Sequence, residues 1–167
     1  MLALSVDMGG THIGCGVVRD RELLGSISLD SERAESLESL LPCVTAVIKK
    51  ILHESGANAG GCEGIAIGFP GIVDVRNGRI LSTLKKYEDA IHLDLPKWAI
   101  EQFGLRLRIE NDARMALLGE QYAGAAQGVQ DVVMITLGTG IGGAAMMLGK
   151  LMRAHTPKLH ASEATYR

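Results

Sequence analysis

Hydrophobic and polar positions follow the same pattern in two stretches that lie far apart in the chain. Leu4–Val18 and Met134–Leu148 each contain an apolar strand, a tight turn rich in Gly and Thr, and a second strand of small residues. Glycine turns let backbone N–H groups approach an anion without a side chain in the way. Two such hairpins facing each other can hold a phosphate chain, so the pair indicates phosphoryl transfer more strongly than either hairpin alone.

The N-terminal part of the chain predicts a meander of strands followed by a helix. The expected strands are Leu2–Asp7, Thr11–Arg19 and Glu22–Asp30. Apolar residues then recur at intervals of three and four over Glu32–Glu54, as in an amphipathic helix. Ser31 is the expected N-cap and Gly56 the expected residue after the C-cap. Pro42 lies inside this pattern, and we expect a kink or a break after Leu41.

Strands and helices alternate through the rest of the chain. The expected elements are a strand at Glu63–Phe69, a hairpin at Ile72–Leu81 around Asn77-Gly78, a helix at Leu95–Phe103, a strand at Leu105–Ile109, a helix at Asn111–Tyr122, and hairpin strands at Asp131–Leu137 and Ile141–Leu148. This alternation predicts an α/β fold in which helices flank a mixed β-sheet. Periodicity is lost after Lys150, where we expect an irregular tail.

Composition narrows the function classes. The chain has 167 residues, 47% of them hydrophobic and 22% charged, which is typical of a globular domain. A net charge of −2 provides no basic surface for nucleic acid, and no apolar run reaches membrane-spanning length. We therefore expect neither nucleic acid nor membrane as a partner. The N-terminus lacks signal-peptide features and the three cysteines have no CxxC spacing, so a cytoplasmic protein with reduced thiols is expected.

The first glycine turn combines a carboxylate with an anion-binding backbone. Asp7 ends a predicted strand and is followed by Gly9, Gly10 and Thr11. A carboxylate beside a phosphate is repulsive unless a cation lies between them, so Asp7 suggests Mg²⁺ reached directly or through water. An Asx-turn, in which the Asp7 side chain bonds a nearby glycine N–H, explains the same residues without a metal. The residues leave both readings open.

The second glycine turn, Gly138–Gly143, also matches the dinucleotide fingerprint GxGxxG. That fingerprint requires a helix after the glycines and an acidic residue about 20 positions later. The following Ala-Ala-Met-Met-Leu is more typical of a strand. A phosphate-binding hairpin is therefore favoured over a nicotinamide-cofactor site, and a glycine turn that merely allows close strand packing is the remaining alternative.

Polar residues follow two further predicted strands. Glu110, Asn111 and Asp112 stand where a strand gives way to a helix, and Asn and Asp are favoured helix caps. Capping alone can explain them. Asp112 at the end of a strand can also serve as a general base for a hydroxyl group, with Asn111 orienting the molecule that carries it. Pro70-Gly71 forms a turn after another strand, and we expect Gly71 to border the same crevice.

Taken together, these motifs resemble the ROK family of bacterial sugar kinases and repressors, within the actin/hexokinase-like superfamily. Four motifs in the family's order carry the resemblance: Asp7-Met-Gly-Gly-Thr11, Gly64-Ile-Ala-Ile-Gly-Phe-Pro-Gly-Ile-Val-Asp74, Glu110-Asn-Asp-Ala113 and Leu137-Gly-Thr-Gly-Ile-Gly-Gly143. The resemblance implies a ribonuclease-H-like (actin-like ATPase) lobe followed by the first hairpin of a second lobe. It also implies ATP and Mg²⁺ between the hairpins, and a hexose or N-acetylhexosamine as the phosphate acceptor.

The resemblance also implies a role for each matching residue. Asp112 would be the catalytic base, and Glu110, Asn111 and Gly71 would contact the sugar. Asp7 would lie at the metal. The residues expected to hold the phosphates are Gly9, Gly10, Thr11, His12, Gly138, Thr139, Gly140 and Gly142. Position 12 is often Lys in the family, so His12 makes the first turn less positive.

The family pattern stops near the end of this chain. Family members continue with a glycine-rich segment ending in Gly-Glu-x-Gly-His, and many then carry a Cys-rich zinc loop. The tail here has neither, so we expect no zinc site. We expect residues 1–126 to form the N-terminal lobe, 127–150 the start of the second lobe, and 151–167 the tail. The chain is then an N-terminal portion of a sugar kinase, inactive by itself.

Unpaired strand edges in an N-terminal portion of this kind favour a second hypothesis about its function. The terminal hairpin would expose apolar surface between Val132 and Leu148. We therefore expect self-association into a homo-oligomer. A non-catalytic module that binds sugar or phosphate, or that serves only in association, is the alternative to an enzyme.

Overall fold

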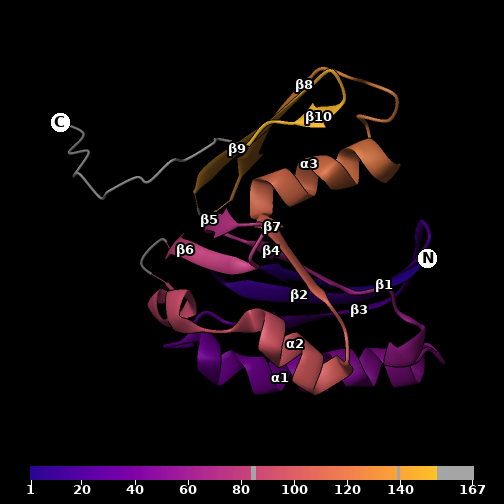
Figure 1. The fold of residues 1–167 in the computed structure, drawn as a ribbon, viewed down its shortest axis with the longest axis vertical. Coiled ribbons are helices and arrows are strands. Elements are labelled where there is room, and N and C mark those ends of the chain that lie inside the picture. Colours follow the sequence, from indigo (N-terminus) through magenta and orange to yellow (C-terminus); the bar gives the residue numbers. More distant parts are fainter. Residues whose placement is uncertain (84–85, 139, 154–167) are drawn as a thin grey trace.

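A five-stranded mixed β-sheet is the largest sheet in the computed structural model, which describes residues 1–83, 86–138 and 140–153 (Figure 1). Its strand order is β3-β2-β1-β4-β7. The strands are β1 (Leu2–Met8), β2 (His12–Arg19), β3 (Glu22–Asp30), β4 (Ile65–Phe69) and β7 (Leu107–Asn111). The first three pair antiparallel through tight turns, which confirms the predicted meander.

The parallel strands β1, β4 and β7 place their carboxyl ends at one edge of this sheet. Asp7 lies opposite Gly68, and Gly68 lies opposite Glu110. This register brings together three segments that are far apart in the sequence. Ligands of open α/β sheets bind beyond the carboxyl ends of the strands, so this edge is the first place to look for a site.

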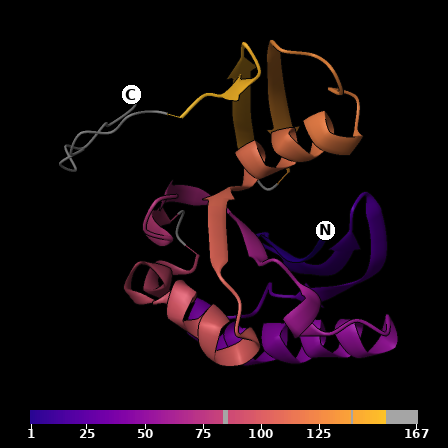
Figure 2. The same cartoon turned by 45° about the vertical axis from the view of Figure 1, so that its right-hand side comes forward.

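Two helices cover one face of the sheet, as Figures 1 and 2 show from different directions. They are α1 (Leu37–Glu54) and α2 (Leu95–Phe103), and the short 3₁₀ helices η1 (Ala59–Gly61) and η2 (Glu88–His92) lie in the connections. The apolar face of α1 and the inward-facing residues of β1, β2 and β4 form one continuous core. The bounds of α2 are as predicted, and Gly104 ends the helix in the left-handed conformation, with φ +70°.

Helix α1 begins five residues later than predicted, because a different residue caps it. The N-cap is Ser36, whose Oγ accepts the Ser39 N–H, and not Ser31. Asp89 of η2 accepts the backbone N–H groups of Leu37 and Glu38 at 2.9 and 2.8 Å. A carboxylate at a helix N-terminus satisfies unpaired donors and interacts favourably with the helix dipole. Periodicity alone does not reveal a cap supplied from another segment.

We expected a kink or a break after Leu41, and a break does not occur, since α1 continues through Pro42 to Glu54. A proline inside a helix removes one backbone hydrogen bond and costs about 3 kcal/mol. The apolar side chains on both sides of Pro42 offset that cost by remaining buried in the core. They are Leu37, Leu40, Leu41, Val44, Ile48, Ile51 and Leu52. Gly56 follows the C-cap with φ +64°, as expected for its predicted position.

A small hairpin and a second sheet complete the fold. The hairpin pairs β5 (Gly71–Asp74) with β6 (Arg79–Thr83) around the predicted Asn77-Gly78 turn. The second sheet has the order β10-β9-β8, with β8 (Val132–Leu137), β9 (Ile141–Met147) and β10 (Lys150–Leu151). Strand β10 was not predicted, because two residues are too short to show a period. The rest of the tail, 154–167, lies outside the described residues.

The second sheet has a core of its own, which it shares with α3 (Asp112–Ala123). Ala113 and Leu117 of α3 pack against Ala144 and Met146 of β9. Figure 2 shows α3 and this sheet together on the side of the main sheet opposite α1 and α2. The second apolar cluster therefore begins at the start of α3, directly after β7.

Candidate functional site

Asp7 at the carboxyl end of β1 and Asp112 directly after β7 lie close together, on either side of Gly68 in the intervening strand β4. A Cβ built on Gly68 would be 3.4 Å from Asp7 Oδ1 and 3.7 Å from the Asp112 Cα atom. Burial and the nearby negative charge of Asp112 raise the pKa of the Asp7 carboxyl above its ordinary value, burial having the larger effect. The structure thus brings together two residues that the sequence analysis assigned to one site.

The Asp112 carboxylate is held by only one of its oxygens. Oδ1 accepts the Ala113 N–H at 2.8 Å and the Asn111 Nδ2 donor at 2.8 Å. In the described part of the chain, Oδ2 accepts no hydrogen bond. The side chain is half-buried in the first turn of α3, so it has a fixed orientation and a free acceptor.

Asn111 connects this carboxylate to the turn after β4. Its Oδ1 accepts the Arg114 N–H at 3.2 Å and thereby caps α3, as predicted. Its Nδ2 also donates to the Gly71 carbonyl oxygen at 3.3 Å. A side chain on Gly71 would clash with the Ser82 carbonyl, so glycine allows β5 and β6 to pair here. Asn111 therefore has both the capping role and a place in the site.

Glu110 lies beneath the site and both of its carboxylate oxygens are engaged. Its Oε1 accepts the Asn111 N–H at 3.0 Å and also interacts with Arg114, 3.4 Å away. Its Oε2 accepts Nε and Nη2 of Arg153, at 2.8 and 2.7 Å. The residue is only 4% exposed. In this arrangement Glu110 supports the Asn111–Asp112 turn, and its contact with a sugar remains a prediction from the family pattern.

The first glycine turn is tightly closed. The Gly9 N–H donates to the His12 carbonyl at 2.9 Å, so it does not form an Asx-turn with Asp7. A Cβ on Gly9 would come within 2.6 Å of that carbonyl, so a residue with a side chain would clash at position 9. Among the described residues, the N–H groups of Gly10 and Thr11 donate to no backbone carbonyl. These two amides are available to an anion, and the exposed His12 ring lies 3.0 Å from Thr11 Oγ1.

The second glycine turn begins a β-strand and not a helix, which argues against the dinucleotide fingerprint. The Gly138 N–H donates to the Gly140 carbonyl at 3.0 Å. A Cβ on Gly142 would lie 3.4 Å from the Ala113 side chain, so β9 starts beside the first turn of α3 and next to Asp112. Thr139 lies outside the described residues, and the phosphate-binding role of this turn stays a prediction.

Mg²⁺ is the cation that these residues fit. Among the described residues no group of three or more His, Cys, Asp or Glu side chains is placed to hold a metal ion. Mg²⁺ commonly binds through one or two carboxylates and completes its shell with water and substrate phosphates. Asp7 beside Asp112 and the nearby glycine turn would supply such a partial set of ligands, and the metal-binding role of Asp7 stays a prediction.

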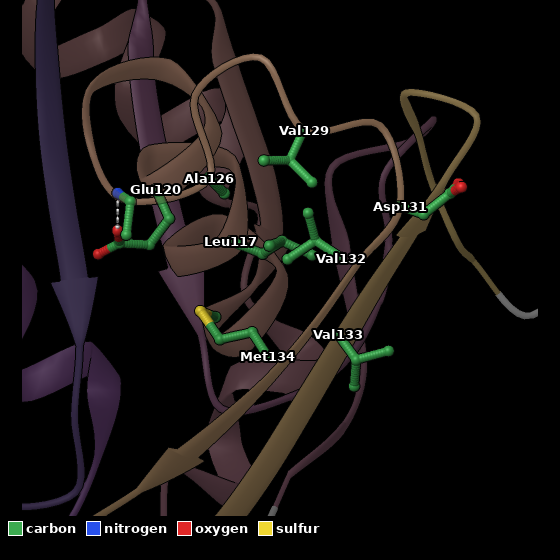
Figure 3. A pocket seen from close by; sticks show the side chains of 9 residues that line it. Leu117, Glu120, Ala126, Val129, Asp131, Val132, Val133 and Met134 are labelled. Atoms are coloured by element: carbon green, nitrogen blue, oxygen red, sulfur yellow. Dashed lines mark hydrogen bonds between the residues drawn. The ribbon is translucent and has the colours of Figure 1, made fainter.

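A cavity of about 580 Å³ lies away from these residues, between α3, the loop after it and β8 (Figure 3). It is lined by Leu117, Glu120, Ala125, Ala126, Val129, Asp131, Val132, Val133 and Met134. Its polar groups already have partners, since Glu120 accepts the Ala125 N–H and Asp131 accepts the Leu148 N–H. The cavity wall is otherwise apolar and carries no group suited to the chemistry of the strand-end site.

Two further residues, Lys86 and Tyr87, contact the first glycine turn and were not predicted from the sequence. Lys86 Nζ donates to the carbonyl oxygens of Gly10 and Ser31, and Tyr87 Oη donates to the Gly9 carbonyl at 2.9 Å. No motif marks them, because they lie in a connection with no periodic pattern.

No helix in the described part of the chain is long and apolar enough to cross a membrane.

Comparisons with known proteins bear on the family and the fold of this chain. The ROK family model matches residues 3–156. A beta-glucoside kinase of Listeria innocua is 34% identical over 92% of this chain and 49% of its own length. The crystal structure of a ROK family glucokinase from Streptomyces griseus, in complex with glucose and AMPPNP, is 32% identical and superposes with a TM-score of 0.79. It covers 92% of this chain and 47% of that one.

A ROK hexokinase from Thermus thermophilus is also similar in structure, with 30% identity and a TM-score of 0.76 over 93% of this chain and 50% of that one. The chain spans about half the length of the relatives that it matches. These relatives are sugar kinases of the actin-like ATPase fold, and the α/β architecture predicted from the sequence is confirmed. The match over residues 3–156 shows that this chain belongs to the ROK family.

Proposed function

We propose that this chain forms the part of an ATP-dependent sugar kinase that binds the acceptor sugar and the transferred phosphate. The neighbouring carboxylates of Asp7, at the end of β1, and Asp112, directly after β7, carry this proposal. One carboxylate suits a metal–phosphate complex and the other a hydroxyl group. Because phosphoryl transfer depends mainly on positioning and charge stabilisation, such a fixed pair beside a glycine turn suits the reaction.

Asp112 is the proposed general base. Its Oδ1 is held by the Ala113 N–H and the Asn111 side chain, which leaves Oδ2 to accept the proton of a sugar hydroxyl. A base must lie within hydrogen-bond reach of the proton that it accepts and must be held in one orientation. Asn111 meets the second requirement and, through its contact with Gly71, borders the proposed sugar site.

The proposed acceptor is a hexose or N-acetylhexosamine. The related Streptomyces griseus glucokinase was crystallised with glucose, and the Listeria innocua relative is a beta-glucoside kinase. Asn111, Gly71 and, from the family pattern, Glu110 are the proposed sugar contacts. The free thiols of Cys15, Cys43 and Cys62 are compatible with the cytoplasmic location that we propose.

ATP and Mg²⁺ are the proposed cofactors. The free N–H groups of Gly10 and Thr11 would hold phosphate oxygens, together with the turn at Gly138–Gly142. Asp7 would hold the cation directly or through water. When bound, Mg²⁺ would neutralise part of the phosphate charge beside the two carboxylates.

Replacing Asp112 by Asn tests the proposed base in the longest protein that the gene encodes. The amide retains an oxygen for the Ala113 N–H but cannot accept the hydroxyl proton. We expect turnover to fall by about 10²- to 10⁴-fold, with nearly unchanged binding of AMPPNP. Phosphorylation of a panel of hexoses and N-acetylhexosamines is the measurement.

Asp94→Asn is the matched control for this experiment. Asp94 caps α2 through the Lys97 N–H, far from the site, so the same chemical change there should leave turnover intact. If Asp112→Asn retains full turnover, Asp112 is not the base. If no sugar in the panel is phosphorylated by the unmodified protein, the kinase proposal itself fails.

A second proposal concerns the association of the 167-residue chain with itself, and it rests on the exposed face of the second sheet. We infer that this chain self-associates and does not turn over sugar alone. One face of the β8–β9 hairpin packs on α3, while the other exposes large apolar side chains. The exposed residues are Val133 (79%), Ile135 (67%), Leu137 (80%), Ile141 (83%) and Met147 (55%). Such a face, beside the unpaired edge of β8, favours association with another copy.

A further inference from the structure

The first glycine turn is connected to the rest of the site by a tyrosine from the segment before η2. Tyr87 is 1% exposed, and its backbone is left-handed, with φ +63° and ψ +39°. A non-glycine residue in this region is uncommon, and such residues cluster where the structure needs a side chain in one particular place. Here the left-handed backbone accompanies a hydroxyl group that donates to the Gly9 carbonyl at 2.9 Å.

The Tyr87 ring makes a second connection, to the end of β4. Its centroid lies 6.2 Å from that of Phe69, at an interplanar angle of 50°. The Phe69 ring in turn would be 3.3 Å from a Cβ on Gly71, whose carbonyl accepts the Asn111 side chain. One buried aromatic pair therefore lies between the turn proposed to bind phosphate and the turn proposed to bind sugar.

Lys86 strengthens the same connection. Its ammonium group donates to the carbonyl oxygens of Gly10 and Ser31, and the Ser31 N–H donates to the Thr11 carbonyl at 2.9 Å. The Gly10 carbonyl belongs to the turn, and the Ser31 carbonyl to the segment that pairs with it after β3. Binding them to an ammonium group orients the turn and places a positive charge beside it, where His12 replaces the family's frequent Lys.

We propose that Tyr87 and Lys86 are positioning residues for the Gly9–Thr11 turn, and that they keep its free amides in the orientation that receives phosphate. This inference rests on the proposed function for its phosphate, whereas the ordering of the turn can be tested without any ligand. Neither residue touches the reacting atoms; both act through the backbone carbonyls that they hold.

The test compares Tyr87→Phe with the unmodified 167-residue chain by residue-resolved amide hydrogen exchange. The substitution keeps the ring against Phe69 and removes only the hydroxyl. We expect the Gly9 and Ser31 amides to exchange about threefold to tenfold faster, as the loss of one hydrogen bond implies. Amides in the middle of β1 and β2 should keep their rates. Lys86→Met, which retains the aliphatic stem, should have the same local effect.

Tyr122→Phe is the matched control. Its hydroxyl also donates to a backbone carbonyl, that of Asp20 at 3.3 Å, but on the surface and outside the site. This variant should leave the Gly9 and Ser31 amides unchanged. Equal exchange at Gly9 in the Tyr87→Phe and unmodified chains would overturn the proposal, and so would faster exchange throughout the sheet, which indicates a general loss of stability.

Binding of AMPPNP with Mg²⁺ provides the second readout. We expect Tyr87→Phe to weaken it by about threefold to tenfold and Tyr122→Phe to leave it unchanged. Faster Gly9 exchange with unchanged AMPPNP affinity would show that Tyr87 orders the turn without serving phosphate, and would overturn the positioning role. If the unmodified chain binds no AMPPNP, the proposed phosphate site fails in this chain, and the exchange of Gly9 still decides whether Tyr87 orders the turn.

Discussion

Two aspartates show how the same side chain responds to opposite surroundings. Asp7 is near Asp112 and partly buried, and both effects raise the pKa of its carboxyl above 3.8. Asp74 lies in the β5–β6 turn, where the Asn77 side chain and the backbone N–H groups of Asn77 and Arg76 lower the pKa of its carboxyl. The charge of Asp7 is thus unfavourable to the folded chain, which is expected where a cation is to bind.

Replacing Asp7 by Asn should stabilise the folded chain at neutral pH. Because the folded chain holds this proton more tightly than the unfolded chain, the corresponding stability is present below pH 3.8 and is lost as the pH rises through the folded-state pKa. Asn carries no charge, so the variant does not lose this stability at high pH, and its midpoint of urea unfolding at pH 7 should be higher than that of the unmodified chain. The difference between the two midpoints should shrink as the pH falls toward 3.8. Mg²⁺ should stabilise the unmodified chain more than this variant.

Asp74→Asn is the control, with the opposite sign expected. A lowered folded-state pKa means that the charged form stabilises the fold above the ordinary pKa, so this substitution should lower the unfolding midpoint at neutral pH. If Asp7→Asn lowers the midpoint as well, the Asp7 carboxylate is not in an unfavourable environment, and the proposed cation site loses its electrostatic support.

At the scale of elements, local pattern predicted nearly every strand and helix, and the errors in α1 arise from contacts with residues distant in the sequence. The three strands of the meander, the β5–β6 hairpin and α2 all follow from periodicity and turn residues close to them in sequence. Helix α1 does not, because its first turn is completed by Asp89 from a distant segment. The buried apolar face of α1 likewise explains why Pro42 fails to break it.

Asp89→Ala should destabilise the chain by about 1 kcal/mol, the typical cost of losing a side chain that accepts backbone N–H groups at a helix N-terminus. The substitution leaves the N–H groups of Leu37 and Glu38 without their carboxylate partner. Urea unfolding followed by circular dichroism measures this difference. Asp30→Ala is a suitable control, because Asp30 accepts the Glu32 N–H in an exposed turn outside the helix. An equal, small effect of both substitutions would show that Asp89 does not cap α1.

For the whole molecule, the described chain has two cores of unequal size. The first is enclosed by the main sheet, α1 and α2, and the second consists of α3 and one face of β8–β9. The opposite face of that hairpin has no cover among the described residues and is strongly apolar. A free edge and an exposed apolar face on the same small sheet are the usual conditions for pairing between chains.

Ile135→Lys should therefore reduce self-association of the 167-residue chain. Ile135 lies in the middle of the exposed face, so a charge there must be buried if two such faces pack. Analytical ultracentrifugation should show a dimer or larger species for the unmodified chain at micromolar concentration and a shift toward monomer for the variant. Ile100→Lys, on an exposed position of α2, should have no such effect. A sharp monomer of the unmodified chain would contradict the proposal.

The family, most of the strands and helices, and the polar residues at the strand ends could be predicted from the sequence. Asp7, Asn111 and Asp112 were identified in this way, because turn chemistry and hydrophobic period depend on neighbours along the chain. Folding was needed to show that Asp7 and Asp112 lie close together, that Glu110 forms an ion pair with Arg153, and that Tyr87 and Lys86 bind the carbonyls of the glycine turn. These relations join segments that are far apart in the sequence and become neighbours only in the folded chain, so no local pattern can reveal them.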